Sequence, residues 1–222
     1  LHKKKICHFQ TNTEFKKPKK MSKNEINRVI NQFKDSSDLA IKAGFDGIEI
    51  HGAHGYLVHC FNTYHTNRRK DEFKYTNLKF VKKLIKECKS TLGNKILSYR
   101  LSIHMVDNYY IRYSKRDYNI KKLVQLLDKL GVNIFHCSEI KFQNKIFNHN
   151  KSLFEEIRST TKKTIIACGG ISNFEDAKKC LKNRADMVAI GRVALINLNI
   201  LNKLKSKKTL KKNFSYNEWQ KL

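Results

Sequence analysis

The chain has 222 residues, which suits about one domain, and no run of about 18 apolar residues that could span a membrane. Its formal charge of +27 comes from lysines scattered along every segment. Together with abundant Asn and Ile and a single Pro, this indicates the bias of an AT-rich genome more than a nucleic-acid surface, which is kept as a weaker reading. The six cysteines form no CxxC pair and no metal-ligand spacing with histidine. We therefore expect a cytoplasmic protein without zinc or an iron–sulfur cluster.

The charge and the hydrophobic pattern divide the chain into three parts. Residues 1–21 are basic, contain KKPKK and lack periodicity, so we expect a tail or linker. Residues 22–205 carry the pattern of a folded domain, and residues 206–222 form a basic extension. The chain begins with leucine instead of methionine, which suggests a fragment or an unusual start.

Helical and strand patterns alternate from residue 22 onward. Ser22 and Glu25 have the spacing of a capping box, apolar residues follow at helical spacing, and Gly44 is expected to end this helix. The strand FDGIEI comes next. The further helices are expected at 78–88, 120–130, 153–157 and 174–181, and the further strands are KILSYRLS, NIFHCSEI, TIIAC and DMVAI. Five strands that alternate with helices predict an α/β fold with a parallel sheet.

The end of the first strand carries a cluster of polar aromatic side chains. Side chains alternate along a strand, so Glu49 and His51 share one face, opposite Ile48 and Ile50. His54 and Tyr56 follow within a glycine-rich turn. One isolated histidine would most simply cap the turn, but two imidazoles and a phenol together predict a site that binds a polar group of a substrate.

Two glycine turns follow the last two strands. Gly169 and Gly170 come directly after TIIAC, and Gly191 is followed by Arg192 after DMVAI. Glycines let backbone amides approach an anion, and a guanidinium can hold it through two hydrogen bonds. Either turn alone could be a tight connection between a strand and a helix. The two in succession predict phosphate binding.

The same segments resemble a known family. EIHGAHGYL followed by F and NRR-x-D-E is similar to the signature of the FMN-dependent ene-reductases of the old yellow enzyme family, and weaker similarity continues through YRLS, ACGGIS and AIGR. The resemblance covers roughly residues 22 to 200. It implies a (β/α)8 TIM barrel of which about five C-terminal βα units are present, because nothing before Met21 resembles the first three.

The resemblance also implies roles for the site residues. His51 and His54 would donate hydrogen bonds to a substrate carbonyl or nitro oxygen, and Tyr56 would give a proton to the α-carbon. Gly169, Gly170, Gly191 and Arg192 would hold the FMN phosphate. Arg100 would lie near N1 and O2 of the flavin; its residue-level alternative is an internal salt bridge, perhaps with Glu49. NAD(P)H would be the reductant, and no metal is expected.

The sequence departs from the family pattern in three places. After Phe73 the family has a Gly-Gly-Ser and an Asn-Arg pair before a helix, whereas Lys74–Asn77 is shorter and lacks both. Asn197-Leu198 replaces Asn-Pro, and the first three barrel units are missing. The leading hypothesis is an FMN-dependent oxidoreductase acting on an activated C=C bond or a similar electrophile. The alternative is an inactive remnant with a structural or interaction role. A missing N-terminal barrel segment or a homo-oligomer could complete the barrel.

Overall fold

The computed structural model describes residues 19–105, 118–147, 150–206 and 208–211. The expected N-terminal tail and most of the C-terminal extension lie outside these residues, so the proposed domain boundaries stay predictions. The helices and strands, in chain order, are α1 (Lys23–Lys42), β1 (Gly47–His51), α2 (Leu57–Asn62), the 3-10 helix η1 (Tyr75–Asn77), α3 (Lys79–Leu92), β2 (Ile96–Leu101), α4 (Ile120–Lys129), β3 (Ile134–Ser138), α5 (Leu153–Arg158), β4 (Thr164–Cys168), α6 (Phe174–Lys182), β5 (Met187–Ala189), α7 (Arg192–Leu195) and α8 (Ile200–Lys205).

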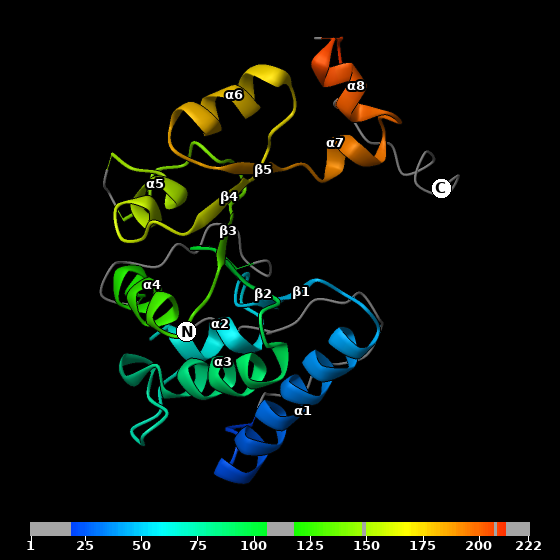
Figure 1. Ribbon diagram of the computed structural model, residues 1–222. Coiled ribbons are helices and arrows are strands. Elements are labelled where there is room, and N and C mark those ends of the chain that lie inside the picture. Colours follow the sequence, from blue (N-terminus) through cyan, green and yellow to red (C-terminus); the bar gives the residue numbers. More distant parts are fainter. Residues whose placement is uncertain (1–18, 106–117, 148–149, 207, 212–222) are drawn as a thin grey trace, which may run out of the picture.

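The five strands form one parallel sheet in the order β1-β2-β3-β4-β5. Each strand therefore pairs with its neighbours in the chain. Figure 1 shows α1, α3, α4, α5 and α6 following one another around one side of this sheet, from blue α1 at the bottom to yellow α6 at the top. The arrangement of successive βα units with helices on one side confirms the predicted incomplete barrel.

The first helix begins as the sequence predicted. Ser22 Oγ accepts a hydrogen bond from the backbone N–H of Glu25, and the Glu25 carboxylate accepts one from the backbone N–H of Ser22. The helix ends at Lys42, two residues before Gly44, which takes a positive φ of 93°. The short helices α2, α7 and α8, of four to six residues, were not predicted.

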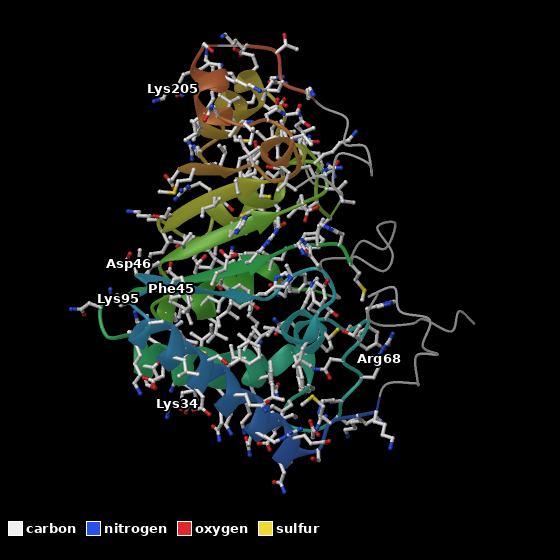
Figure 2. The ribbon with its side chains drawn as sticks, turned by 90° about the vertical axis from the view of Figure 1, so that its right-hand side faces the viewer. Lys34, Phe45, Asp46, Arg68, Lys95 and Lys205 are labelled. Atoms are coloured by element: carbon white, nitrogen blue, oxygen red, sulfur yellow. The ribbon has the colours of Figure 1, made fainter. Side chains whose placement is uncertain are left out.

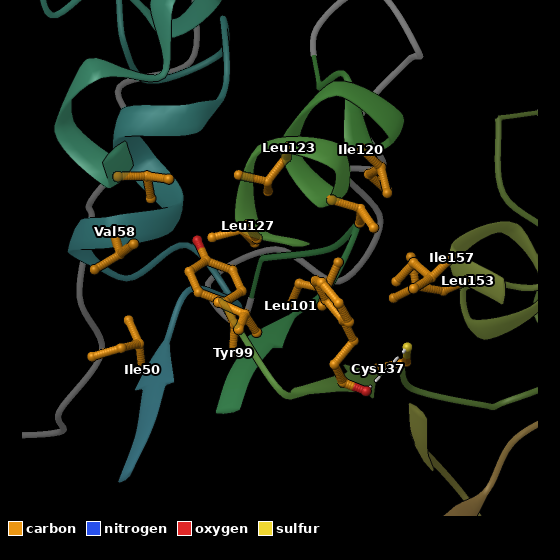
Figure 3. Packing of buried hydrophobic residues seen from close by; sticks show 14 of the residues in the cluster. Ile50, Val58, Tyr99, Leu101, Ile120, Leu123, Leu127, Cys137, Leu153 and Ile157 are labelled. Carbon is orange, nitrogen blue, oxygen red and sulfur yellow. Dashed lines mark hydrogen bonds between the residues drawn. The ribbon is translucent and has the colours of Figure 1, made fainter. Parts of the chain in front are cut away.

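The hydrophobic core lies between the sheet and the helices. Tyr99 and Leu101 on β2 face the helix side and are fully buried, as are Leu123 and Leu127 on α4 (Figure 3). Tyr99 also accepts a hydrogen bond of 3.1 Å from Asn62 Nδ2 on α2, so its hydroxyl is satisfied. The helix side of the sheet is therefore the packed side.

The opposite face of the sheet is the inner face of the incomplete barrel. The register places Glu49, Ser98 and Arg100 on this face, with His136 and Cys168 on the strands that follow. Two apolar residues near the strand starts on this face are exposed: Ile96 has 44% and Met187 has 52% of its surface accessible. No described helix covers this face.

The amino and carboxyl ends of the strands carry different residues. Where β1 and β2 begin, Lys95 Nζ lies 3.1 Å from Asp46 Oδ1, and Figure 2 shows both beside the exposed Phe45. Arg68, which follows α2, lies on the opposite side in that view. Because parallel strands all run in one direction, the segments that follow the strands lie together at their carboxyl ends. No helix among the described residues is long and apolar enough to cross a membrane.

Within the described residues, β1 and β5 each have one neighbouring strand, so their outer backbone groups are unpaired. We predict that the isolated chain self-associates through these edges. Met187→Lys on β5 should weaken the association, because it places a charge beside the open edge. Leu201→Lys on α8 is the matched control, since Leu201 is also exposed but lies outside the sheet. Sedimentation velocity would measure both. An unchanged association in Met187→Lys would contradict an edge-to-edge contact through β5.

Candidate active site

The carboxyl ends of the strands bring the predicted site residues together. His51 ends β1 and is paired in register with Arg100 on β2. Ser138 ends β3 and is paired with Cys168 at the end of β4. These side chains share the inner face because their positions along the neighbouring strands have the same parity. The carboxyl ends of barrel strands are where such folds carry their chemistry.

The turn after β1 is held in one conformation by its neighbours. Gly52 lies so close to β2 that a Cβ atom there would stand 2.2 Å from the Tyr99 ring, which excludes any larger residue. His54 adopts a left-handed backbone conformation with φ of 61°. Its backbone N–H donates to Ser102 Oγ at 2.9 Å, and its Nε2 lies 3.1 Å from Ser138 Oγ. Both ends of His54 are thus fixed by residues far away in the sequence.

The three residues predicted to contact substrate form one cluster. The ring centroids of His51 and His54 are 5.2 Å apart, and those of His51 and Tyr56 are 5.0 Å apart. All three side chains are partly accessible. The close spacing means that one small polar group could contact more than one of these rings.

Both histidines are neutral at pH 7. Burial, followed by the charge of Arg100, lowers the pKa of His51. Burial, followed by the charges of His104 and Arg100, lowers the pKa of His54 to about 3. A neutral imidazole has one N–H donor and one acceptor nitrogen. The pair can therefore donate hydrogen bonds to a ligand oxygen without carrying a positive charge.

Two buried polar atoms at the site have no partner within the described part of the chain. They are His51 Nδ1 and Arg100 Nε. Arg100 does donate from Nη2 to Ser138 Oγ at 2.9 Å, so one side of its guanidinium is engaged. Unpaired buried polar atoms cost about 1–3 kcal/mol each, and native proteins keep few of them. Their presence on the inner face indicates a polar ligand that would satisfy them.

Glu49 does not pair with Arg100, which was the structural alternative for that arginine. Its Oε2 accepts a hydrogen bond from Ser98 Oγ at 2.8 Å and lies 3.0 Å from His136 Nδ1. Although burial opposes the shift, His136, Ser98 and then Arg100 lower the pKa of this carboxyl group. The carboxylate is thus engaged with neighbours on both sides, and Arg100 keeps its free Nε for another partner.

The two predicted glycine turns are neighbours in space. Cys168 on β4 is paired with Ala189 on β5, so the turns that follow these residues lie at the same edge of the sheet. Gly169 has a φ of 134°, and a Cβ atom there would lie 2.2 Å from the Glu139 carbonyl oxygen. The site around Gly191 is open, and Arg192 is exposed and forms no ion pair with the described residues. The predicted phosphate role for these turns fits this placement but stays a prediction.

Sequence reasoning missed the buried residues that support the turn after β1. Gly55 N–H donates to His59 Nδ1 at 2.9 Å, and His59 is fully buried on α2. His104 and Glu139 are also buried, with 3.5 Å between His104 Nδ1 and Glu139 Oε2, and the His104 ring lies 5.0 Å from that of His54. His59 lies four residues after Gly55 on a helix too short to show its period, and His104 and Glu139 come from other βα units.

Comparison with known proteins agrees with this arrangement. Residues 2–211 match the model of the NADH:flavin oxidoreductase / NADH oxidase family. The chain belongs to this family. Its FMN-dependent members include the old yellow enzymes, so the family resemblance seen in the motifs is confirmed. The match extends beyond the roughly 22–200 covered by those motifs.

Individual relatives are similar over part of their length. The chain is 30% identical over 188 residues to the NADH oxidase of Thermoanaerobacter brockii, covering 79% of this chain and 28% of that protein. It is 31% identical over 192 residues to 12-oxophytodienoate reductase 2 of Arabidopsis thaliana, covering 82% of this chain and 50% of the reductase. The old yellow enzyme homologue of Zymomonas mobilis superposes with a TM-score of 0.80 at 22% identity, covering 95% of this chain and 60% of that structure. The chain thus spans about half or less of these two sequence relatives.

The buried His59 makes the free energy of unfolding depend on pH. Burial lowers its folded-state pKa to about 3, against about 6.5 in the unfolded chain. The folded state therefore takes up fewer protons, and stability is lost as the pH falls from 6.5 toward 3. We predict a loss on the order of 1–2 kcal/mol from this group between pH 6.5 and pH 5.

The measurement is urea unfolding at pH 7 and pH 5 for the native chain and for His59→Gln. Glutamine keeps an acceptor for Gly55 N–H but does not titrate, so its stability should fall less on acidification. If both proteins lose the same free energy of unfolding, His59 is not the titrating group.

Proposed function

We propose that the chain is the substrate-binding and cofactor-binding part of an FMN-dependent oxidoreductase, which passes hydride from NAD(P)H through flavin to an activated C=C bond or a similar electrophile. One observation carries the proposal. The cluster of His51, His54 and Tyr56 lies at the same sheet edge as Arg100 and the two glycine turns, in a member of a flavin oxidoreductase family. The substrate is a small molecule.

The residues present fit FMN. Arg100 Nε and His51 Nδ1 are buried polar atoms that need a partner, and a flavin ring offers carbonyl oxygens and ring nitrogens. The phosphate would be held by Gly170, Gly191 and Arg192. Gly169 would allow the backbone of this turn to pass close to the Glu139 carbonyl group. Bound flavin supplies hydride transfer. The role of Arg100 is to place a positive charge at the end of the ring where negative charge accumulates on reduction.

His51 and His54 would bind the oxygen of the substrate. As neutral imidazoles, both can donate hydrogen bonds to a carbonyl or nitro oxygen, and these bonds strengthen as negative charge develops there. Tyr56 lies beside His51, and an ordinary phenol is protonated at neutral pH. It can therefore supply the proton that the α-carbon takes up after hydride arrives at the β-carbon.

The competing proposal is a remnant that no longer catalyses and serves as a structural or interaction protein. It is favoured by the open inner face and by the exposed apolar residues near the strand starts. In the first reading, a further barrel segment or a second copy of the chain would cover this face, and the protein would work in the cytoplasm. Titration of the chain with FMN, followed by anaerobic NAD(P)H and then cyclohexenone, separates the two. Flavin binding and reoxidation of the flavin by the enone, in the chain alone or with the missing barrel segment supplied, support the enzyme; no flavin binding in either state supports the remnant.

Arg192→Ala tests the phosphate anchor. The loss of a charge-assisted contact should weaken FMN binding by about 1.5–3 kcal/mol, which corresponds to roughly ten- to hundredfold in Kd. Lys182→Ala is the control, because it removes one positive charge from the exposed end of α6, at the opposite edge of the sheet. Quenching of flavin fluorescence reports both affinities. Equal affinities in the two variants would leave the second turn a purely structural connection.

Replacing His51 by alanine and His54 by glycine in one variant tests their contact with substrate, because neither new side chain can donate a hydrogen bond. Glycine adopts the left-handed backbone conformation at position 54 without strain. Reduction of bound flavin by NAD(P)H should stay within a few-fold, while reoxidation by cyclohexenone should slow by about 100-fold or more, as expected for lost oxyanion donors. Stopped-flow absorbance resolves the two half-reactions. Equal losses in both would assign the histidines to the flavin or the fold.

A further inference from the structure

A second group of reactive side chains lies deeper on the inner face, on strands β1 to β4. Ser98 donates to Glu49, and the Glu49 carboxylate lies 3.0 Å from His136 Nδ1. Cys168 lies on the next strand, on the same face, two residues after the position paired with His136. The roles proposed above for His51, His54 and Tyr56 do not use this group.

The hydrogen-bond pattern gives the three groups an order. His136 is largely buried, and its Nδ1 faces the carboxylate, so the ring is held by Glu49. Its Nε2 is buried and makes no regular hydrogen bond within the described residues. Cys168 is a free, partly accessible cysteine, and the sheet register places it directly opposite Ser138 and diagonally across from His136 on the same face. A carboxylate that orients an imidazole, which in turn neighbours a thiol, is the arrangement of an activated nucleophile.

The charges of the group favour a thiolate. Despite burial, the neighbouring Cys168 and the Glu49 carboxylate, which accepts a hydrogen bond from Nδ1, raise the pKa of His136 to about 8, so its ring is protonated at pH 7. Burial also opposes the shift at Cys168, but His136 and then Arg100 lower the pKa of the thiol. Cys137 on β3 and Cys180 on α6 are neighbouring thiols, and burial raises the pKa of both. The imidazolium and the guanidinium are the cations near Cys168.

We propose that Cys168, with His136 and Glu49, is a nucleophilic site that captures electrophilic alkenes such as α,β-unsaturated carbonyl compounds. The sulfur forms a bond to the β-carbon, and the electron pair of the C=C bond moves toward the carbonyl group. The α-carbon then takes the proton held by His136. The net change is addition of S–H across the double bond, with no external oxidant or reductant. The site needs no flavin and does not depend on the proposed function.

Covalent labelling of the apoprotein with cyclohexenone at pH 7 tests the site, with peptide mass spectrometry giving the rate at each cysteine. Cys60 is the internal reference, because it is also partly accessible but donates its S–H to the Gly55 carbonyl oxygen. A larger thiolate fraction reacts faster, so Cys168 should be labelled severalfold faster than Cys60. Cys168→Ser should remove the fast adduct. Equal rates at Cys60 and Cys168 would overturn the proposal.

His136→Gln separates an activated thiol from one that is merely accessible. It should slow labelling at Cys168 severalfold and leave Cys60 unchanged. Labelling of the fully buried Cys88 reports unfolding in each variant. If His136→Gln unfolds the chain by that measure, Glu49→Gln decides instead, because it leaves the imidazole in place without its carboxylate. An unchanged rate at Cys168 in a folded variant of either kind would overturn the role of the imidazole.

Discussion

The alternation of side chains across a parallel sheet is the constraint on which the rest of this structure depends. Each strand places one set of residues under the helices and the other on the inner face. Tyr99 and Leu101 are therefore buried against α4, while Ser98 and Arg100, their neighbours in sequence, face inward. A shift of one residue in register would exchange the two sets and bury an arginine in the core. The same pattern thus fixes the fold and exposes the reactive groups.

The inner face has two levels of polar chemistry. At the strand ends, His51, His54 and Tyr56 are held by a turn that is itself fixed by Ser102 and His59. One layer deeper, Glu49 and His136 form their own hydrogen-bonded group next to Cys168. Arg100 lies between the levels, because it donates to Ser138 and its charge reaches both groups of histidines. Burial keeps the upper imidazoles neutral, whereas the carboxylate of Glu49 keeps the lower one protonated.

Among the described residues, no helix covers the inner face, and β1 and β5 each have only one neighbouring strand. In a closed barrel, side chains from all strands fill the interior and every strand has two neighbours. Here Ile96 and Met187 remain exposed at the strand starts, although they lie on the face that a closed barrel would bury. A chain with this surface gains stability from anything that covers it, including a further segment, a second copy or a bound cofactor.

The sequence by itself determined the alternation of helices and strands, the parallel sheet and the shared face of Glu49 and His51. These follow from local periodicity and from distinctive motifs, which need no knowledge of distant contacts. Only the tertiary structure decided that Glu49 pairs with His136 and not with Arg100, that His59 supports the turn, and that Cys168 neighbours an imidazole. The contacts of Glu49 and Cys168 join residues on different βα units, and the contact of His59 with Gly55 depends on how α2 packs. Their geometry depends on strand register and side-chain packing, which spacing along the chain does not encode.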